Sequence, residues 1–277
     1  KGVIAASAGN HAQGLAMAAK LMGVKAVIVM PRITPDIKVQ AVRARGAKVV
    51  LKGDAFAAAA EHAQELIKEH GYTYIPPFDD IDVVAGQGTI GVEILRQHSG
   101  RLDAIFIPVG GGGLIAGVAA YVKYLRPDIK IIGVEAEDSA CLKAALEAGE
   151  RVVLDQVGVF AEGVAVAQIG DVPFSLVRDL IDDVITVNTD EMCAAVKDIF
   201  EDTRAVAETS GALSLAGLKK YVQQTGAEGE TLLCINSGAN TNFDRLQHIA
   251  ERTELGEQRE AILAVTIAEK PGSFKKF

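Results

Sequence analysis

Short apolar runs alternate with helix-like segments along most of the chain, and this alternation constrains the fold more than any other feature. In the first part of the chain the apolar runs lie at residues 3–6, 26–30, 49–51 and 72–75. A strand, a helix and another strand in succession are typical of a parallel sheet, because parallel neighbours need a long crossover connection. We therefore predict an α/β fold built on parallel strands.

The alternation is interrupted at Pro76 and Pro77 and then resumes. Further strands are expected at residues 104–108, 130–135, 183–187 and 231–236, with helices between them. We place a domain boundary near residue 80. This predicts a small subdomain over residues 2–79 and a larger one over residues 80–255.

Composition limits the classes of partner. The 36 acidic and 28 basic residues give a net charge of −8, which argues against a nucleic-acid-binding surface. The three cysteines form no CxxC pair, so a reducing compartment fits better than a disulfide scaffold or a zinc site. No apolar run approaches the ~20 residues that a bilayer requires. We expect a cytoplasmic protein with small-molecule partners, without nucleic acid or membrane.

The strongest local signal is a run of four glycines between a predicted strand and a predicted helix: Gly110, Gly111, Gly112 and Gly113. Without Cβ atoms, successive backbone N–H groups can converge on an anion at the helix N-terminus, where the helix dipole favours negative charge. A tight turn needs only one or two glycines, so the run predicts a phosphate site. It matches neither the P-loop nor a clean G-x-G-x-x-G pattern, which disfavours ATP and NAD.

Two further segments follow predicted strands, SAGNH at residues 7–11 and SGAN at residues 237–240. The backbone amides of the first could hold a carboxylate, and Asn10 could donate to a phenolate-like oxygen; a plain helix cap is the alternative. In the second, Ser237 offers a neutral hydroxyl at the end of a strand, and an ordinary turn is the alternative. A planar, phosphorylated, heteroaromatic cofactor would use all three segments.

These motifs resemble the tryptophan-synthase-β-like family of pyridoxal-phosphate enzymes. The resemblance rests on five ordered motifs over essentially the whole chain: SAGNH at 7–11, MP…P…K…GA within 30–47, GGGGL at 110–114, GVE at 133–135 and SGAN at 237–240. Within the family, the chain is most similar to the biosynthetic threonine ammonia-lyases. The resemblance implies fold type II of these enzymes, with two parallel-sheet βα subdomains, and pyridoxal 5'-phosphate as cofactor.

The resemblance also implies roles for individual residues. Asn10 matches the donor to the cofactor's ring oxygen, and Ser237 matches the hydroxyl partner of its pyridine nitrogen. A neutral partner there makes the ring a weaker electron sink, which suits β-elimination better than transamination. The implied phosphate-binding residues are Gly110, Gly111, Gly112, Gly113 and Leu114. The residues that the resemblance implies for binding the substrate carboxylate are Ser7, Ala8, Gly9 and His11.

The activity implied is elimination of L-threonine to 2-oxobutanoate and ammonia, the first step of isoleucine biosynthesis, by a homo-oligomer (tetramer or dimer). Residues 256–277 are expected to be a linker and the start of an ACT-like regulatory domain of an allosteric enzyme. The family's cofactor-bearing lysine, in a Ser-x-Lys-x-Arg-Gly motif, would lie upstream of Asn10. We therefore assign no catalytic residue, and we expect the chain as given to turn over poorly if at all.

Several alternatives stay open. Serine racemases carry a second serine where this chain has Ala8, so elimination is favoured over racemisation, but a serine dehydratase or racemase acting on L-serine is the runner-up. A non-catalytic amino-acid-binding paralogue is the third reading. No metal site is predicted, because residues 158–161 before Glu162 contain no acid. Glu208 matches a family element beside the cofactor; it is either a supporting group or a solvated carboxylate.

Overall fold

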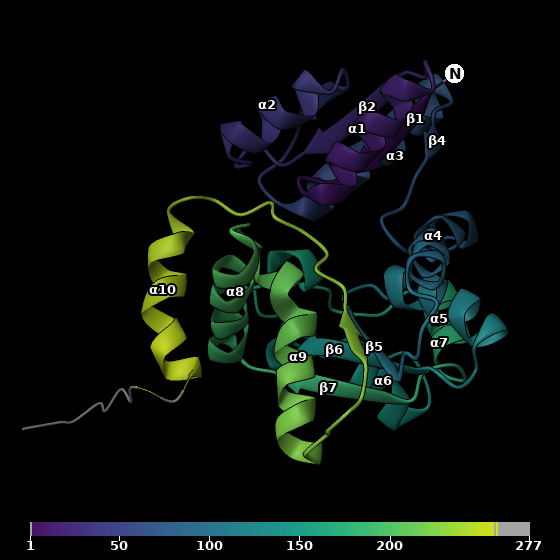
Figure 1. Ribbon diagram of the computed structural model, residues 1–277. Helices are drawn as coiled ribbons and strands as arrows, with labels where there is room; N and C mark the ends of the chain where they lie inside the picture. Colours follow the sequence, from purple (N-terminus) through teal and green to yellow (C-terminus); the bar gives the residue numbers. More distant parts are fainter. Residues whose placement is uncertain (1, 258, 260–277) are drawn as a thin grey trace, which may run out of the picture.

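The computed structural model describes residues 2–257 and 259, and its strands form two four-stranded parallel sheets (Figure 1). The first sheet has the order β3-β2-β1-β4. Its strands are β1 (Val3–Ala6), β2 (Ala26–Met30), β3 (Lys48–Leu51) and β4 (Thr73–Tyr74). The second sheet has the order β7-β6-β5-β8. Its strands are β5 (Ala104–Pro108), β6 (Lys130–Ala136), β7 (Asp183–Val187) and β8 (Leu232–Cys234). The predicted α/β fold with two parallel-sheet subdomains is confirmed.

Helices cover both faces of the first sheet. They are α1 (Asn10–Leu21), α2 (Asp36–Ala44) and α3 (Phe56–His70). Because side chains alternate along a strand, Ala5 faces the alanines of α1 while Ile4 and Ala6 face those of α3. Alanine on the helices lets them pack closely against the sheet.

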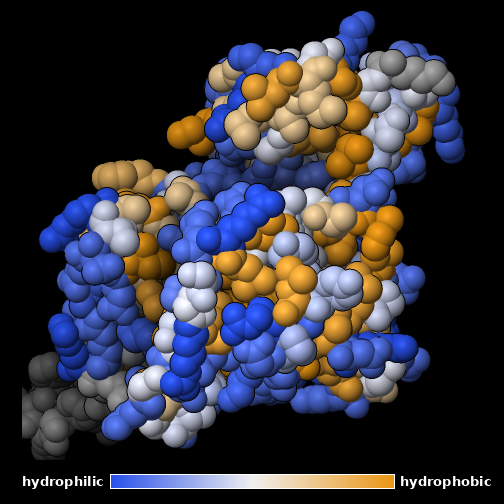
Figure 2. All heavy atoms as spheres, turned by 45° about the vertical axis from the view of Figure 1, so that its right-hand side comes forward, coloured by the Kyte–Doolittle hydropathy of each residue, from blue (hydrophilic) through white to orange (hydrophobic). Residues whose placement is uncertain are grey.

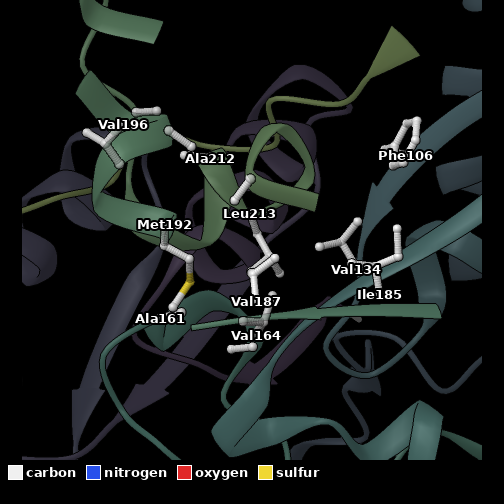
Figure 3. Packing of buried hydrophobic residues seen from close by; sticks show 14 of the residues in the cluster. Phe106, Val134, Ala161, Val164, Ile185, Val187, Met192, Val196, Ala212 and Leu213 are labelled. Carbon is white, nitrogen blue, oxygen red and sulfur yellow. The ribbon is translucent and has the colours of Figure 1, made fainter. Parts of the chain in front are cut away.

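The second sheet is also enclosed on both faces. On one face lie α4 (Ile81–Gln97), α5 (Gly113–Leu125), α6 (Cys141–Ala148) and α7 (Asp171–Val177). On the other lie α8 (Thr189–Thr203) and α9 (Thr209–Thr225), and α10 (Arg245–Gly256) packs against α8. Figure 3 shows this core, which includes Phe106 and Val134 from the sheet, Met192 from α8 and Leu213 from α9. Short 3-10 turns lie at η1 (Glu137–Ser139) and η2 (Glu162–Val164).

Helix α4 begins earlier than its sequence indicates. Residues 87–89 predict a helix start, but the helix begins at Ile81 and is capped by Asp80, whose Oδ1 accepts from the N–H groups of Asp82 and Val83 at 2.8 and 3.2 Å. The glycine at 88 is a packing residue and not a turn, since a Cβ there would lie 2.9 Å from the carbonyl oxygen of Gly117 on α5.

The division between the two sheets lies between Tyr74, which ends β4, and Ile81, which begins α4. Figure 2 shows the smaller body above the larger one. The limits 2–79 and 80–255 stay predictions. The predicted linker and ACT-like start fall mainly on residues 258 and 260–277, outside the described residues. In the part of the chain that the structure describes, no helix is long and apolar enough to cross a bilayer.

Candidate functional site

The glycine run and the Ser237 turn meet at one edge of the second sheet. Strands β5 and β8 are parallel neighbours with Phe106 paired to Cys234. The pairing continues where the N–H of Ile235 donates to the carbonyl of Phe106 at 3.1 Å. Both segments therefore leave the sheet at its carboxyl edge, which is where α/β sheets bind ligands.

The glycine run forms the turn into α5. Gly112 has a φ of +86°, which favours glycine, and α5 begins at Gly113, so the first-turn N–H groups have no intrahelical acceptor. A Cβ on Gly110 would lie 2.9 Å from Cα of Val164, and one on Gly111 would overlap the ring of Phe78. The loop is thus packed against protein behind and presents its backbone N–H groups, as an anion site requires.

Phe78 is a residue of this region that sequence reasoning missed. Its ring packs on Gly111, and a Cβ on Gly113 would lie 3.1 Å from its own Cβ. The neighbouring Asp79 accepts from the N–H of Val172 at the start of α7 at 2.9 Å. No local pattern marks Phe78, because its partner lies some thirty residues further along the chain.

The SAGNH segment forms the turn from β1 into α1. Gly9 is the N-cap and no side chain caps the helix, so Asn10 is the first helical residue. Ser7 Oγ accepts from the N–H of Gly9 at 3.3 Å, and the half-buried Ala8 contributes no polar side chain. The helix-cap alternative for Asn10 is therefore wrong, and the free N–H groups of the first turn of α1 stay available to a carboxylate.

His11 is held inside the small subdomain. Its Nε2 lies 3.0 Å from the carbonyl oxygen of Ile75, which can only accept, so Nε2 carries the proton. Burial lowers the pKa of His11, although the bond to Ile75 opposes that effect. The ring is therefore neutral near pH 7, and its contact with substrate stays a prediction.

Asn10 reaches across to the large subdomain. Its Nδ2 donates to Oε1 of Glu208 at 2.7 Å. Glu208 precedes α9, and its main-chain N–H donates to the carbonyl of Gly238 at 3.0 Å. A Cβ on Gly238 would lie 3.2 Å from Nδ2 of Asn10, so the structure brings Asn10 beside the turn that carries the exposed Ser237.

A second polar link joins the subdomains and was also missed from the sequence. Glu162 of η2 accepts from Nζ of Lys38 on α2 at 2.9 Å and from Nη2 of Arg245 on α10 at 2.6 Å. Partial burial raises the pKa of Glu162, but the two cations outweigh it and lower the pKa overall. A shallow pocket between the subdomains is lined by these three side chains together with Glu208, Ser210 and Asn240.

A buried carboxyl group lies behind the glycine loop. Glu135 at the end of β6 is fully buried and accepts from the N–H groups of Leu142 and Lys143 at 2.8 and 2.9 Å. Burial raises its pKa to about 7. Beside it, Cys141 Sγ donates to the carbonyl of Gly110 at 3.4 Å, and burial raises the pKa of this thiol to about 12. Across residues 2–257 and 259, no group of three or more His, Cys, Asp or Glu side chains is arranged to hold a metal ion.

Comparison with known proteins gives concordant results. Residues 1–238 match the family described as "Pyridoxal-phosphate dependent enzyme". The chain is 60% identical over its whole length to the biosynthetic L-threonine dehydratase of Salmonella typhimurium, of which it covers 54%. It is 54% identical to the chloroplastic biosynthetic threonine dehydratase of Arabidopsis thaliana, over its full length and 47% of that protein. It therefore spans about half the length of these relatives.

The fold is likewise similar to that of a solved relative. The processed form of threonine deaminase isoform 2 from Solanum lycopersicum superposes with a TM-score of 0.89 at 49% identity. The match covers 91% of this chain and 73% of that one.

Proposed function

The chain belongs to the family of pyridoxal-phosphate-dependent enzymes, and we propose that it forms the catalytic part of a threonine ammonia-lyase that converts L-threonine to 2-oxobutanoate and ammonia. The observation that carries this proposal is 60% identity along the whole chain to a biosynthetic threonine dehydratase. The arrangement at the carboxyl edge of the second sheet is consistent with it.

The residues present fit pyridoxal phosphate. A packed glycine loop at a helix N-terminus suits its phosphate, and we assign that contact to residues 110–114. Asn10 would donate to the ring oxygen and Ser237 would pair with the ring nitrogen. When bound, the cofactor withdraws electrons from the substrate's Cα, which permits loss of the α-proton and the β-hydroxyl.

The chain's own groups have distinct tasks in this scheme. The first-turn N–H groups of α1 bind the substrate carboxylate and orient the Cα–H bond. Because the hydroxyl of Ser237 is neutral, it does not stabilise a protonated ring nitrogen as a carboxylate would. The ring then withdraws electrons less strongly, which favours elimination over transamination. The ring of Phe78 packs on Gly111 and so supports the loop from that side.

The side chain at position 8 supports elimination over racemisation. Racemisation needs an acid or base on each face of the substrate, and Ala8 has no group that could move a proton. L-serine, which also carries a β-hydroxyl, is the alternative substrate. We further propose a homo-oligomer, dimer or tetramer, in the cytoplasm; a relative with a chloroplastic name shows that location varies among similar proteins.

The test is an assay of the full-length protein that contains this chain. We expect 2-oxobutanoate from L-threonine with a higher kcat/KM than pyruvate from L-serine, and no D-serine. Ser237→Ala should lower kcat by about tenfold or more, while Ser175→Ala on α7 serves as a matched control. A preference for serine, D-serine formation, or amino-acid binding without turnover would each contradict the proposal.

A further inference from the structure

Asn10 has its orientation set by a partner from the other subdomain. Nδ2 of Asn10 lies 2.7 Å from Oε1 of Glu208, 198 positions further along the chain. A carboxylate can only accept a hydrogen bond, so the contact directs the NH₂ end of the amide towards Glu208. One of the two N–H bonds is used in this contact, and the second stays available for another acceptor.

Glu208 is itself fixed by two backbone hydrogen bonds. Its N–H donates to the carbonyl of Gly238, and its carbonyl accepts from the N–H of Ala212 in the first turn of α9, both at 3.0 Å. The half-buried Glu208 thus belongs to a rigid helix start. Asn10, by contrast, is exposed and would sample several rotamers without a partner.

Gly238 makes the contact possible. A Cβ at position 238 would overlap Oε1 of Glu208. Only glycine therefore leaves room for the carboxylate between the Ser237 turn and Asn10. The same Cβ would lie 3.2 Å from Nδ2 of Asn10, so a side chain at this position disturbs both members of the pair.

We propose that Glu208 is a positioning residue that holds the carboxamide of Asn10 with its second N–H directed at the ring oxygen of the bound cofactor. This inference rests on the proposed function for the identity of the cofactor. It assigns a role to Glu208 beyond that of a solvated helix-start carboxylate, and it explains why residue 238 is glycine. Glu208 acts through Asn10 and touches neither substrate nor cofactor in this scheme.

The test measures cofactor affinity directly. Apo forms of the full-length protein are titrated with pyridoxal phosphate, and binding is followed by fluorescence. We expect Glu208→Ala to raise the dissociation constant about tenfold, the effect of one charge-assisted hydrogen bond. Glu208→Gln, whose amide oxygen can still accept, should recover most of the affinity. Glu228→Ala, an exposed carboxylate on another segment, is the control.

Two further variants separate positioning from a general structural effect. Gly238→Ala keeps Glu208 but displaces its carboxylate, so it should weaken binding as Glu208→Ala does. The double variant Asn10→Ala/Glu208→Ala should bind no more weakly than Asn10→Ala alone, because Glu208 acts through Asn10. Additive losses in the double variant, or wild-type affinity in folded Glu208→Ala, would overturn the inference.

The outcome for the proposed function is read separately. If the full-length protein eliminates serine in preference to threonine, the substrate assignment fails while the affinity pattern still tests Glu208. In the active enzyme, Glu208→Ala should lower kcat about tenfold and change KM less than about threefold, because the substrate carboxylate is bound by main-chain N–H groups of α1 and not by the side chain of Asn10. A large rise in KM with unchanged kcat would contradict the assigned role.

Discussion

Glu135 is a carboxyl group that the fold buries completely behind the glycine loop. Burial raises its pKa from 4.5 to about 7, although two backbone N–H groups favour its charged form. Between these values the folded protein binds a proton that the unfolded chain has lost. Stability therefore falls as the pH rises from about 4.5 to about 7, by up to about 3 kcal/mol, and becomes insensitive to this group above that range.

The measurement is the free energy of unfolding in urea at several pH values between 5 and 8. Glu135→Gln cannot ionise, so its stability should change less with pH than that of the wild type, whatever its absolute value. Glu147→Gln, an exposed carboxylate on α6, removes the same charge and should keep the wild-type slope. Equal slopes for all three proteins would show that Glu135 does not titrate in this window.

Residues differ in how far their roles could be read from the sequence. The four glycines and the strand-end position of Ser237 are local signals, and the structure places both at one sheet edge. The partner of Asn10 could not be deduced from local pattern, since the contact with Glu208 joins positions 198 apart. The resemblance points to Glu208 without giving its partner, and the hydrogen bond to Asn10 favours a supporting group over a solvated carboxylate.

Helices α4 and α5 approach each other through glycines. A Cβ on Gly117 would overlap the carbonyl oxygen of Val84, and one on Gly88 would lie 2.9 Å from the carbonyl oxygen of Gly117. We expect Gly117→Ala to force the helices apart and to lower the free energy of unfolding by about 1–3 kcal/mol. Urea denaturation with a check on the m value measures this.

Gly86→Ala provides the matched comparison on the same helix. This glycine is exposed, and a Cβ there would meet nothing within 4 Å. Alanine is the better helix former by about 1 kcal/mol, so Gly86→Ala should be as stable as the wild type or more so. If both substitutions had the same effect, close approach of the helices would not be the cause.

Prediction from the sequence located some strands and helices correctly and misplaced the start of α4. Strands such as β2 and β5 are short runs of buried residues, and the apolar pattern locates both from end to end. The start of α4 was placed too late, at residues 87–89 and not at Ile81. Gly88, which lies inside this helix, is needed for its close packing against Gly117 of α5, and no local pattern reveals that contact.

The two subdomains are joined by polar contacts at their facing surfaces. Glu162 of the large subdomain accepts from Lys38 of the small one and from Arg245 of α10. Sequence patterns predict the two sheets because each is built from successive βα units. They do not predict this link, whose members come from α2, η2 and α10 and are ion-paired only when the subdomains lie together.

The ion pair between Lys38 and Glu162 should hold the small subdomain in place. The side chain of Lys38 is largely buried, with 13% exposed, and that of Glu162 is about half exposed, at 48%. A double-mutant cycle with Lys38→Met and Glu162→Gln should give a coupling of about 1 kcal/mol in unfolding free energy. The coupling should decrease in high salt, since the pair is partly accessible to solvent. Neutralising the exposed pair Arg126–Asp128, which lies within one subdomain, should give little coupling.

A distance measurement tests the same link at the scale of the whole molecule. Spin labels placed at exposed positions 61 on α3 and 147 on α6 report on the separation of the subdomains. Breaking the ion pair with Glu162→Gln should broaden the distance distribution, because fewer contacts then oppose relative motion of the two bodies. Arg126→Met should leave the distribution unchanged. A distribution that is equally narrow in all three proteins would mean that Asn10–Glu208 and apolar packing alone fix the arrangement.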